Sequence, residues 1–368
     1  MKLPFYAKGA LLCIGIYFFV VMLQGTQAIL VPLIFGTLIA ILLNPVVNFF
    51  EKWKLNRILA ICFTLFLSVI VIAACGLFIY SQLSMFSESW PVFIDKFTQL
   101  INQTIQWIPG YFDISAVKVN EWILETKATL LDSSSLVIGK TLLSVGTGLV
   151  VVFLIPVYVF LLLYYKPLLL DFIYRLFKSG KSGNVAVIIT QTKFVVQKYL
   201  VGLVLETLLV AILNSIGLLI LGIDYAILIG ILGALLNLIP YIGGIVAIAI
   251  PMMIALVTRD SPWFVLYVVG VYYFVQLVDN NYIVPKIVAS KVRINALVSI
   301  VAVLAGGALW GVSGMFLSIP LVAIIKVICD HVEPLKPFGF LLGDTMPAIH
   351  FPSIKQVIQK KGKQTENL

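Results

Sequence analysis

Long apolar runs recur along this chain of 368 residues and constrain its fold more than any other feature. A helix needs roughly 20 predominantly apolar residues to cross the hydrocarbon core of a bilayer. Continuous runs of this kind cover residues 9–23, 28–49, 58–83, 141–165, 200–221 and 262–282. Two further runs, 225–257 and 296–328, are interrupted by glycine and proline. The sequence therefore predicts an all-α, polytopic transmembrane helical bundle.

The charged residues are few and lie between the apolar runs. Hydrophobic residues make up 61% of the chain and charged residues 11%, whereas soluble domains carry about a quarter charged residues. A net charge of +9 would point to nucleic acid in a soluble protein. Here the basic residues stand in loops, where they orient a chain in the membrane. We expect the lipid bilayer as a partner and no nucleic acid.

The sequence carries no catalytic or cofactor motif. Gly180, Lys181 and Ser182 match the end of a phosphate-binding loop, but that motif needs a glycine where Arg175 stands. The Gly-x-Ser-x-Gly and H-E-x-x-H motifs of hydrolases are missing too. The four cysteines and two histidines have no metal-ligand spacing. We therefore expect no enzyme activity, nucleotide, cofactor or metal.

The loop charges predict the orientation of the chain. Lysine and arginine concentrate in cytoplasmic loops, and here they dominate the N-terminus, residues 51–57 and residues 166–198. Residues 84–140 hold six acidic and four basic residues, which permits the outer side. The sequence therefore predicts that both termini are cytoplasmic and that residues 84–140 lie outside.

This topology divides the chain into six regions. They are the N-terminal helices 1–83, an outer helical segment 84–140, a transmembrane helix 141–165, a cytoplasmic amphipathic linker 166–198, a transmembrane core 199–335 and a cytoplasmic tail 336–368. Apolar residues recur at helical spacing up to Ile108, and Pro109 and Gly110 then break the pattern. We interpret residues 84–140 as a small helical cap; a lid or a subunit contact is the alternative.

The two interrupted runs share a pattern of helix, Gly/Pro break and a second helix that contains Ile-Pro. The candidate break residues are Pro240, Tyr241, Gly243, Gly244, Gly307, Gly311, Gly314 and Pro320. Each arm is short for a full span, so both runs can form helical hairpins that enter from opposite faces. Such paired, interrupted segments point to the binding site of a transporter. Kinked helices that span fully would give the same loop topology, so both interpretations stay open.

Small residues predict close packing at two places. Gly307 and Gly311 are four residues apart, as are Ser144 and Gly148, and this spacing lets two helix backbones approach. We expect subunit or helix contacts there.

Two acids lie inside apolar runs. Glu206 is six residues past Leu200, and Asp279 is six residues before Pro285, so each is about 9 Å from the cytoplasmic end of its helix. An acid at membrane depth usually faces a cavity or a partner. Two carboxyl groups at matched depth suit a shared proton or cation, and we predict them as the coupling residues. The alternative is that both are hydrated at the headgroup boundary.

Amides accompany the two acids. The candidates for a polar substrate path are Asn214, Asn237, Gln276, Asn280 and Asn281. Such groups either line a path or join helices by hydrogen bonds.

Three motifs together carry a resemblance to a known family. They are residues 237–244 (NLIPYIGG), residues 276–285 (QLVDNNYIVP) and residues 306–320 (GGALWGVSGMFLSIP). In order, spacing and hydropathy the chain resembles the autoinducer-2 exporter family of bacterial membrane proteins from residue 10 to about 336. The resemblance implies a multi-pass protein of the bacterial inner membrane with about eight helical segments. It also implies a homo-oligomer, with a pentamer as one form.

The resulting functional hypothesis is a secondary transporter or exporter. Its substrate would be a small polar solute similar to autoinducer-2, or a monovalent cation, coupled to protons or sodium, because the resemblance covers both activities. The alternative is a structural or regulatory membrane protein that acts through its outer segment. Substrate, direction and coupling ion are not set by the sequence.

Overall fold

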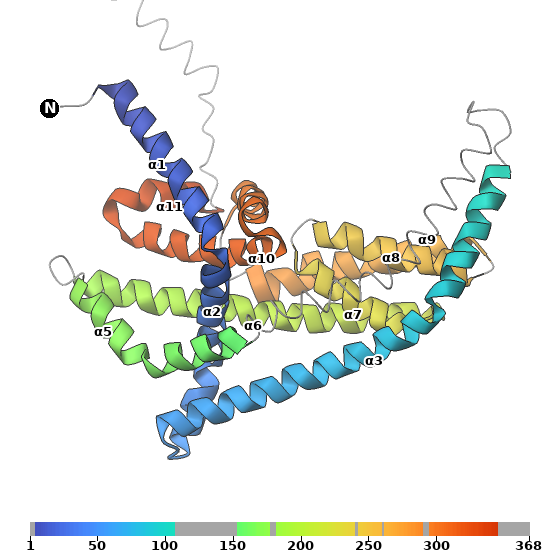
Figure 1. Cartoon of the computed structure of the whole chain (residues 1–368), viewed down its shortest axis with the longest axis horizontal. Coiled ribbons are helices and arrows are strands. Elements are labelled where there is room, and N and C mark those ends of the chain that lie inside the picture. The colour runs from blue at the N-terminus through green and yellow to red at the C-terminus, as the bar shows by residue number, and fades with distance from the viewer. Residues whose placement is uncertain are drawn as a thin grey trace, which may run out of the picture.

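The computed structural model describes residues 4–106, 153–176, 182–239, 242–259, 261–289 and 294–344. Within these ranges the protein is built from helices, and the only β feature is an isolated bridge between Ile294 and Gly343. Figure 1 shows long helices that cross one another. The all-α prediction is confirmed.

The helices follow the apolar runs closely. In chain order they are α1 (Phe5–Gly25), α2 (Gln27–Lys52), α3 (Arg57–Gln106), a helix at Phe153–Tyr164, α5 (Lys166–Leu176), α6 (Ser182–Ile220), α7 (Ala226–Asn237), α8 (Ile242–Thr258), α9 (Trp263–Val278), the π-helix η1 (Asp279–Ala289), α10 (Ala296–His331), the short 3-10 helix η2 (Glu333–Leu335) and α11 (Lys336–Leu342). Among the described residues six helices are long and apolar enough to cross a membrane when α10 is counted as one continuous helix. A bent pair, Phe153–Tyr164 with Lys166–Leu176, brings the number to seven.

Two helices extend further than the loop charges suggest. α3 continues to Gln106 and so includes the first part of the predicted outer segment. α6 begins at Ser182, so the second half of the predicted linker forms the first turns of the same helix.

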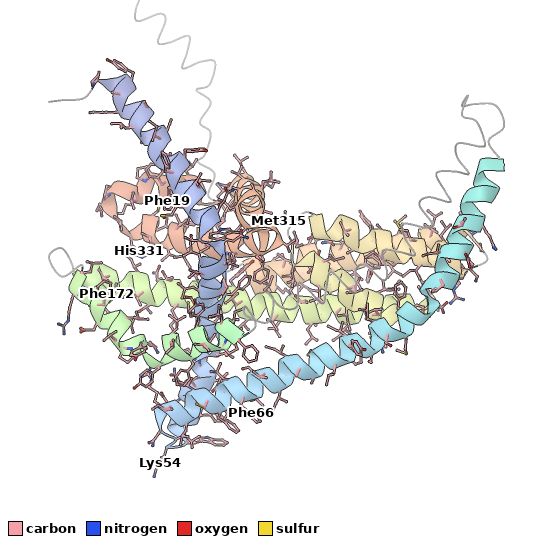
Figure 2. The ribbon with its side chains drawn as sticks, viewed as in Figure 1. Phe19, Lys54, Phe66, Phe172, Met315 and His331 are labelled. Atoms are coloured by element: carbon pink, nitrogen blue, oxygen red, sulfur yellow. The ribbon has the colours of Figure 1, made fainter. Side chains whose placement is uncertain are left out.

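The outward faces of the helices carry large apolar side chains. Phe18 on α1 and Ile72 and Leu77 on α3 are each exposed by 65% or more. Figure 2 shows Phe66 on the long α3 and Phe172 on α5, which are also exposed. Such apolar coverage is unfavourable in water and favourable in lipid. The surface therefore supports a multi-pass membrane protein.

The largest buried core joins α6, α7, α8 and α9. Leu218, Ile229, Ile254 and Val268 meet there, one from each helix, and each is at most 2% exposed. Packing in this core holds the end of α7 and the start of α8 close to the polar C-terminal end of α9.

α10 is a helical hairpin and not one straight helix. Its backbone leaves the helical region at Trp310, and Gly311 has a positive φ of 62°. The Ser318 hydroxyl donates to the Ala302 carbonyl at 2.8 Å, sixteen residues back, which requires the chain to reverse. Gly306 and Gly314 pack directly on each other between the two arms. The predicted hairpin is therefore present.

Several predicted details of this hairpin are wrong. Only Gly311 lies at the reversal, whereas Gly307, Gly314 and Pro320 lie within the helical arms. A Cβ added at Gly311 would meet open space among the described residues, so Gly311 makes no helix contact within this chain, and the predicted subunit contact at Gly307 and Gly311 stays a prediction. The reversal pairs residues that are equally distant from Trp310, namely 306 with 314 and 302 with 318. The second predicted contact, Ser144 with Gly148, lies outside the described residues.

Candidate functional site

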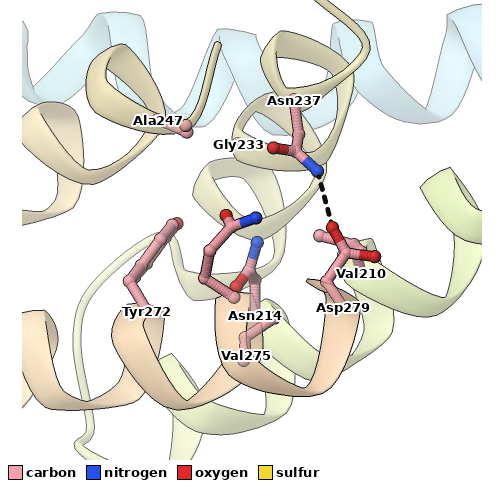
Figure 3. A pocket seen from close by; sticks show the side chains of 10 residues that line it. Val210, Asn214, Gly233, Asn237, Ala247, Tyr272, Val275 and Asp279 are labelled. Atoms are coloured by element: carbon pink, nitrogen blue, oxygen red, sulfur yellow. Dashed lines mark hydrogen bonds between the residues drawn. The ribbon is translucent and has the colours of Figure 1, made fainter. Parts of the chain in front are cut away.

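A small polar cavity lies where α6, α7, α8 and the junction of α9 with η1 meet. Its lining residues are Val210, Asn214, Gly233, Asn237, Gly244, Ala247, Tyr272, Val275, Gln276 and Asp279. Figure 3 shows four labelled polar side chains that converge from three places: Asn214 from α6, Asn237 from α7, and Tyr272 and Asp279 from α9 and its continuation η1. The cavity has room for about one water molecule.

Asp279 is the one acid that lines the described cavity, and it is 2% exposed. The Asn237 side-chain amide donates to Asp279 Oδ2 at 3.1 Å, and the dashed line in Figure 3 marks this bond. Asn237 is the last residue of α7, at the break that the sequence predicts. The break therefore brings an amide to the buried carboxyl group.

Three buried oxygens around the cavity lack partners within the described part of the chain. They are Asp279 Oδ1, Asn214 Oδ1 and the Tyr272 hydroxyl. A buried polar atom without a hydrogen bond costs about 1–3 kcal/mol, so such atoms are rare unless something binds them. Carboxylate, amide and hydroxyl oxygens together suit a proton, a water molecule or a small hard cation.

Glycines hold the cavity open. A Cβ added at Gly233 would lie 3.0 Å from the Tyr272 hydroxyl oxygen. A Cβ added at Gly244 would lie 3.5 Å from Gln276 Oε1 and 3.8 Å from Asn237 Oδ1. Any larger side chain at these positions would take space from the polar groups.

The helix geometry changes at the acid itself. α9 ends at Val278, and the π-helix η1 begins at Asp279 and contains Pro285. π-Helical turns are uncommon and occur frequently at functional sites. The irregular backbone thus coincides with the one acid of the described cavity.

Glu206 lies near the cavity without lining it. It is 9% exposed and close enough to Asp279 for the two charges to interact. Glu206, Val210 and Asn214 are spaced by four residues and so share one face of α6. Glu206 is therefore about 6 Å along the helix axis from the cavity wall at Val210.

The remaining predicted residues divide into three groups. The first group lines the cavity: three predicted path residues, Asn214, Asn237 and Gln276, and one predicted break residue, Gly244. Asn280 and Asn281 are exposed; Asn280 accepts from Gln276, and Asn281 donates to the Leu277 carbonyl. The prediction that they line the path is not supported by their positions. Gly243 lies in the first turn of α8, and Pro240 and Tyr241 lie outside the described residues.

Sequence reasoning missed Tyr272 and Gly233. Tyr272 is four residues before Gln276 and seven before Asp279, which places all three on one face of the helix. That spacing was a signal available in the sequence. Gly233 had no such signal, because its role depends on the approach of α9 to α7.

These features define a class: a multi-pass helical membrane protein with a buried, polar, acid-containing site at a broken helix. The chain also matches the AI-2E family transporter description over residues 10–333. It therefore belongs to the AI-2E family of transporters.

Curated relatives agree with this assignment. YrrI of Bacillus subtilis (strain 168) is 25% identical over 316 residues, which are 83% of this chain and 87% of YrrI. The AI-2 transport protein TqsA of Escherichia coli (strain K12) is 25% identical over 324 residues, 86% of this chain and 90% of TqsA. YueF of Bacillus subtilis (strain 168) is 32% identical over 128 residues, 35% of this chain and 34% of YueF.

Proposed function

We propose that the protein is a secondary transporter in which Asp279 binds the coupling proton or monovalent cation. The observation that carries this proposal is the buried carboxyl group with one oxygen held by Asn237 and the other unpaired within the described chain. An acid at membrane depth that faces a cavity is a functional site by default. Asn214 and Tyr272 supply the neighbouring oxygens.

Glu206 is the second member of the proposed pair. Its charge and that of Asp279 repel when both carboxyl groups are ionised, so one bound proton or cation relieves the repulsion. Glu206 lies one helical turn before the cavity wall at Val210, on the predicted cytoplasmic side of that wall along α6. We assign it the transfer of the proton or cation between the cavity and the cytoplasm.

The break between α7 and α8 supplies the moving part in this proposal. α7 has 12 residues and spans about 18 Å, well short of the roughly 30 Å hydrocarbon core. This short length supports the proposal that α7 and α8 enter and return on one side of the membrane as a re-entrant hairpin. A shift of this hairpin would separate Asn237 from Asp279 and open the cavity.

The substrate in this proposal is a small polar solute or the cation itself. The relative TqsA is named an AI-2 transport protein, which makes autoinducer-2 a solute to include in transport assays. The described cavity admits about one water molecule, so this conformation fits an ion better than a sugar-like solute. A larger solute would require the hairpin to open.

The proposed location is a bacterial inner membrane, with both termini cytoplasmic. The lysine and arginine excess in residues 51–57 and 166–198 supports this orientation. Cysteine labelling in a cysteine-free background tests it. Label applied from outside should reach Ser115→Cys and not Ser182→Cys, and the reverse pattern would contradict the orientation.

Transport in proteoliposomes tests the proposed function. The purified protein is reconstituted with a proton-sensitive dye inside, and sodium, lithium and autoinducer-2 are offered in turn. We expect a coupled proton signal with the wild-type protein. Asp279→Asn should abolish it, and Glu206→Gln should abolish or strongly reduce it, while expression and assembly persist because a neutral amide is easier to hold in a membrane than a charge.

Asp224→Asn is the matched control for these variants. Asp224 is an exposed acid outside the cavity, and the same chemical change there should leave transport intact. Full coupled transport in Asp279→Asn would contradict the proposal. Equal loss in Asp224→Asn would show that the assay reports general damage and would remove the support for Asp279.

A further inference from the structure

A second polar cluster lies far from the cavity, at the junction of α2, α3, the helix Phe153–Tyr164 and α5. The Lys166 ammonium donates to Asn44 Oδ1 at 2.8 Å. The Arg57 guanidinium donates to the Leu163 carbonyl oxygen at 2.7 Å. Lys193 on α6 and Glu51 on α2 are close enough to interact electrostatically with Lys166. Among the described residues, three basic groups and one acid therefore interact at this junction.

Two donors in this cluster are buried and unsatisfied. Asn44 is 5% exposed, and its Nδ2 has no hydrogen-bond acceptor in the described ranges. Arg57 Nε is likewise buried without an acceptor in the part of the chain that the structure describes. A cluster with excess positive charge and orphaned donors favours an acceptor that carries negative charge.

The surroundings place this cluster at the level of lipid headgroups. Trp53, Tyr164 and Tyr165 flank it in sequence, and their exposed fractions are 66%, 39% and 47%. Exposed tryptophan and tyrosine mark the membrane–water interface. The apolar helix Phe153–Tyr164 ends here, immediately before Lys166.

We propose that Arg57, Lys166 and Lys193 bind the phosphate of an anionic phospholipid, with Asn44 holding the Lys166 ammonium in place. Basic pockets between transmembrane helices on the cytoplasmic side bind such headgroups. The phosphate oxygens accept from the Arg57 guanidinium, and the two lysine ammonium groups neutralise the phosphate charge. The acyl chains lie along the apolar exposed face of α3, where Phe66 is exposed.

Lipid retention tests this site in the full-length protein. The protein is placed in nanodiscs of phosphatidylcholine alone or of phosphatidylcholine with phosphatidylglycerol, and native mass spectrometry counts the lipids that remain bound. We expect selective retention of phosphatidylglycerol. Lys193→Gln should weaken it by about fivefold, since one basic residue near the surface contributes that much.

Lys52→Gln is the matched control, because Lys52 is an exposed lysine at the same end of α2. It should retain phosphatidylglycerol as the wild-type protein does. Arg57→Gln is the second variant and should weaken retention at least as much as Lys193→Gln. Lys193 has no hydrogen-bond partner among the described residues, so its replacement should leave the fold intact even if Arg57→Gln does not.

Three outcomes would overturn the proposal. Equal weakening by Lys52→Gln and Lys193→Gln would indicate diffuse attraction. Equal retention of phosphatidylcholine and phosphatidylglycerol would indicate that water satisfies the donors. Competition by inorganic phosphate is the third outcome. If phosphate displaces phosphatidylglycerol and raises the thermal midpoint of unfolding as much as the lipid does, the site binds free phosphate.

Discussion

The two interrupted hairpins share a sequence pattern and differ in what they enclose. The break between α7 and α8 presents Asn237 to a buried acid on a neighbouring helix. The reversal within α10 encloses only its own arms, where Gly306 meets Gly314 and Ser318 donates to the Ala302 carbonyl. Trp310 at this reversal donates from its indole nitrogen to the Leu23 carbonyl oxygen of α1.

This difference teaches that a Gly/Pro break does not by itself make a site. The α10 hairpin satisfies Ser318 within its own arms and Trp310 against α1, and its close backbone approach stabilises the bundle. The α7–α8 hairpin leaves oxygens of Asp279, Asn214 and Tyr272 unpaired within the described chain. This difference is consistent with the proposal that the first hairpin serves transport and the second serves packing.

The largest expected effect is on folding, from Gly306→Val in the α10 hairpin. A side chain at Gly306 would overlap the Ser318 hydroxyl and the Gly314 carbonyl, so the two arms could not close. We expect loss of monodisperse protein in size-exclusion chromatography after detergent extraction. Gly270→Ala on α9 is the control, because its added Cβ meets no described atom and should be neutral or stabilising by up to about 1 kcal/mol. A Gly306→Val protein that elutes as the wild-type protein does would contradict the close packing of Gly306 on Gly314.

The next effect is on transport, from Tyr272→Phe in the cavity. Removal of the hydroxyl deletes one of the unpaired oxygens, so the bound ion loses one ligand. We expect coupled flux to fall by about tenfold. Thermal stability should not fall. Tyr273→Phe makes the same change one residue away on an exposed side chain and should leave flux unchanged. Equal flux in the two variants would remove Tyr272 from the site.

A smaller effect distinguishes one glycine of each hairpin, Gly244 and Gly307. Gly244→Ala places a methyl group 3.5 Å from Gln276 Oε1, which narrows the cavity without a clash, and should lower coupled flux by about twofold to threefold. Gly307→Ala in α10 contacts only the flexible Met315 side chain. It should leave flux unchanged. A larger loss of flux in Gly307→Ala than in Gly244→Ala would contradict the proposed roles of the two hairpins.

The smallest expected effect concerns Asn281, although it stands two residues from Asp279. Its side chain is exposed and donates to the Leu277 carbonyl of its own helix. Asn281→Ala should therefore change neither flux nor thermal midpoint beyond experimental error. A transport defect with normal stability would show that the path extends beyond the described cavity.

Much of this fold follows from local sequence. The apolar runs predict the spanning helices because membrane burial requires a minimum length of continuous apolar chain. The breaks predict both hairpins because glycine and proline weaken a helix in any surroundings. Asp279 and Asn237 are conspicuous as polar groups within such runs, and the structure places them in contact.

The remainder depends on three-dimensional register. Gly306 and Gly314 meet only because the chain reverses at Trp310 and Gly311, and the glycine-rich stretch offers several possible reversal points. Asn280 and Asn281 belong to the same polar patch as Asp279, yet helix geometry turns them to the exposed surface. Sequence spacing alone identifies the patch, and packing decides which of its members face the cavity.

Infrared difference spectroscopy of the reconstituted protein tests the central claim most directly. Addition of the coupling cation should remove the carbonyl stretch of a protonated carboxylic acid, because the cation displaces the proton from Asp279. This signal should be absent in Asp279→Asn and present in Asp224→Asn. The same signal in wild-type protein and Asp279→Asn would contradict the account, because Asp279 would then not bind the coupling ion.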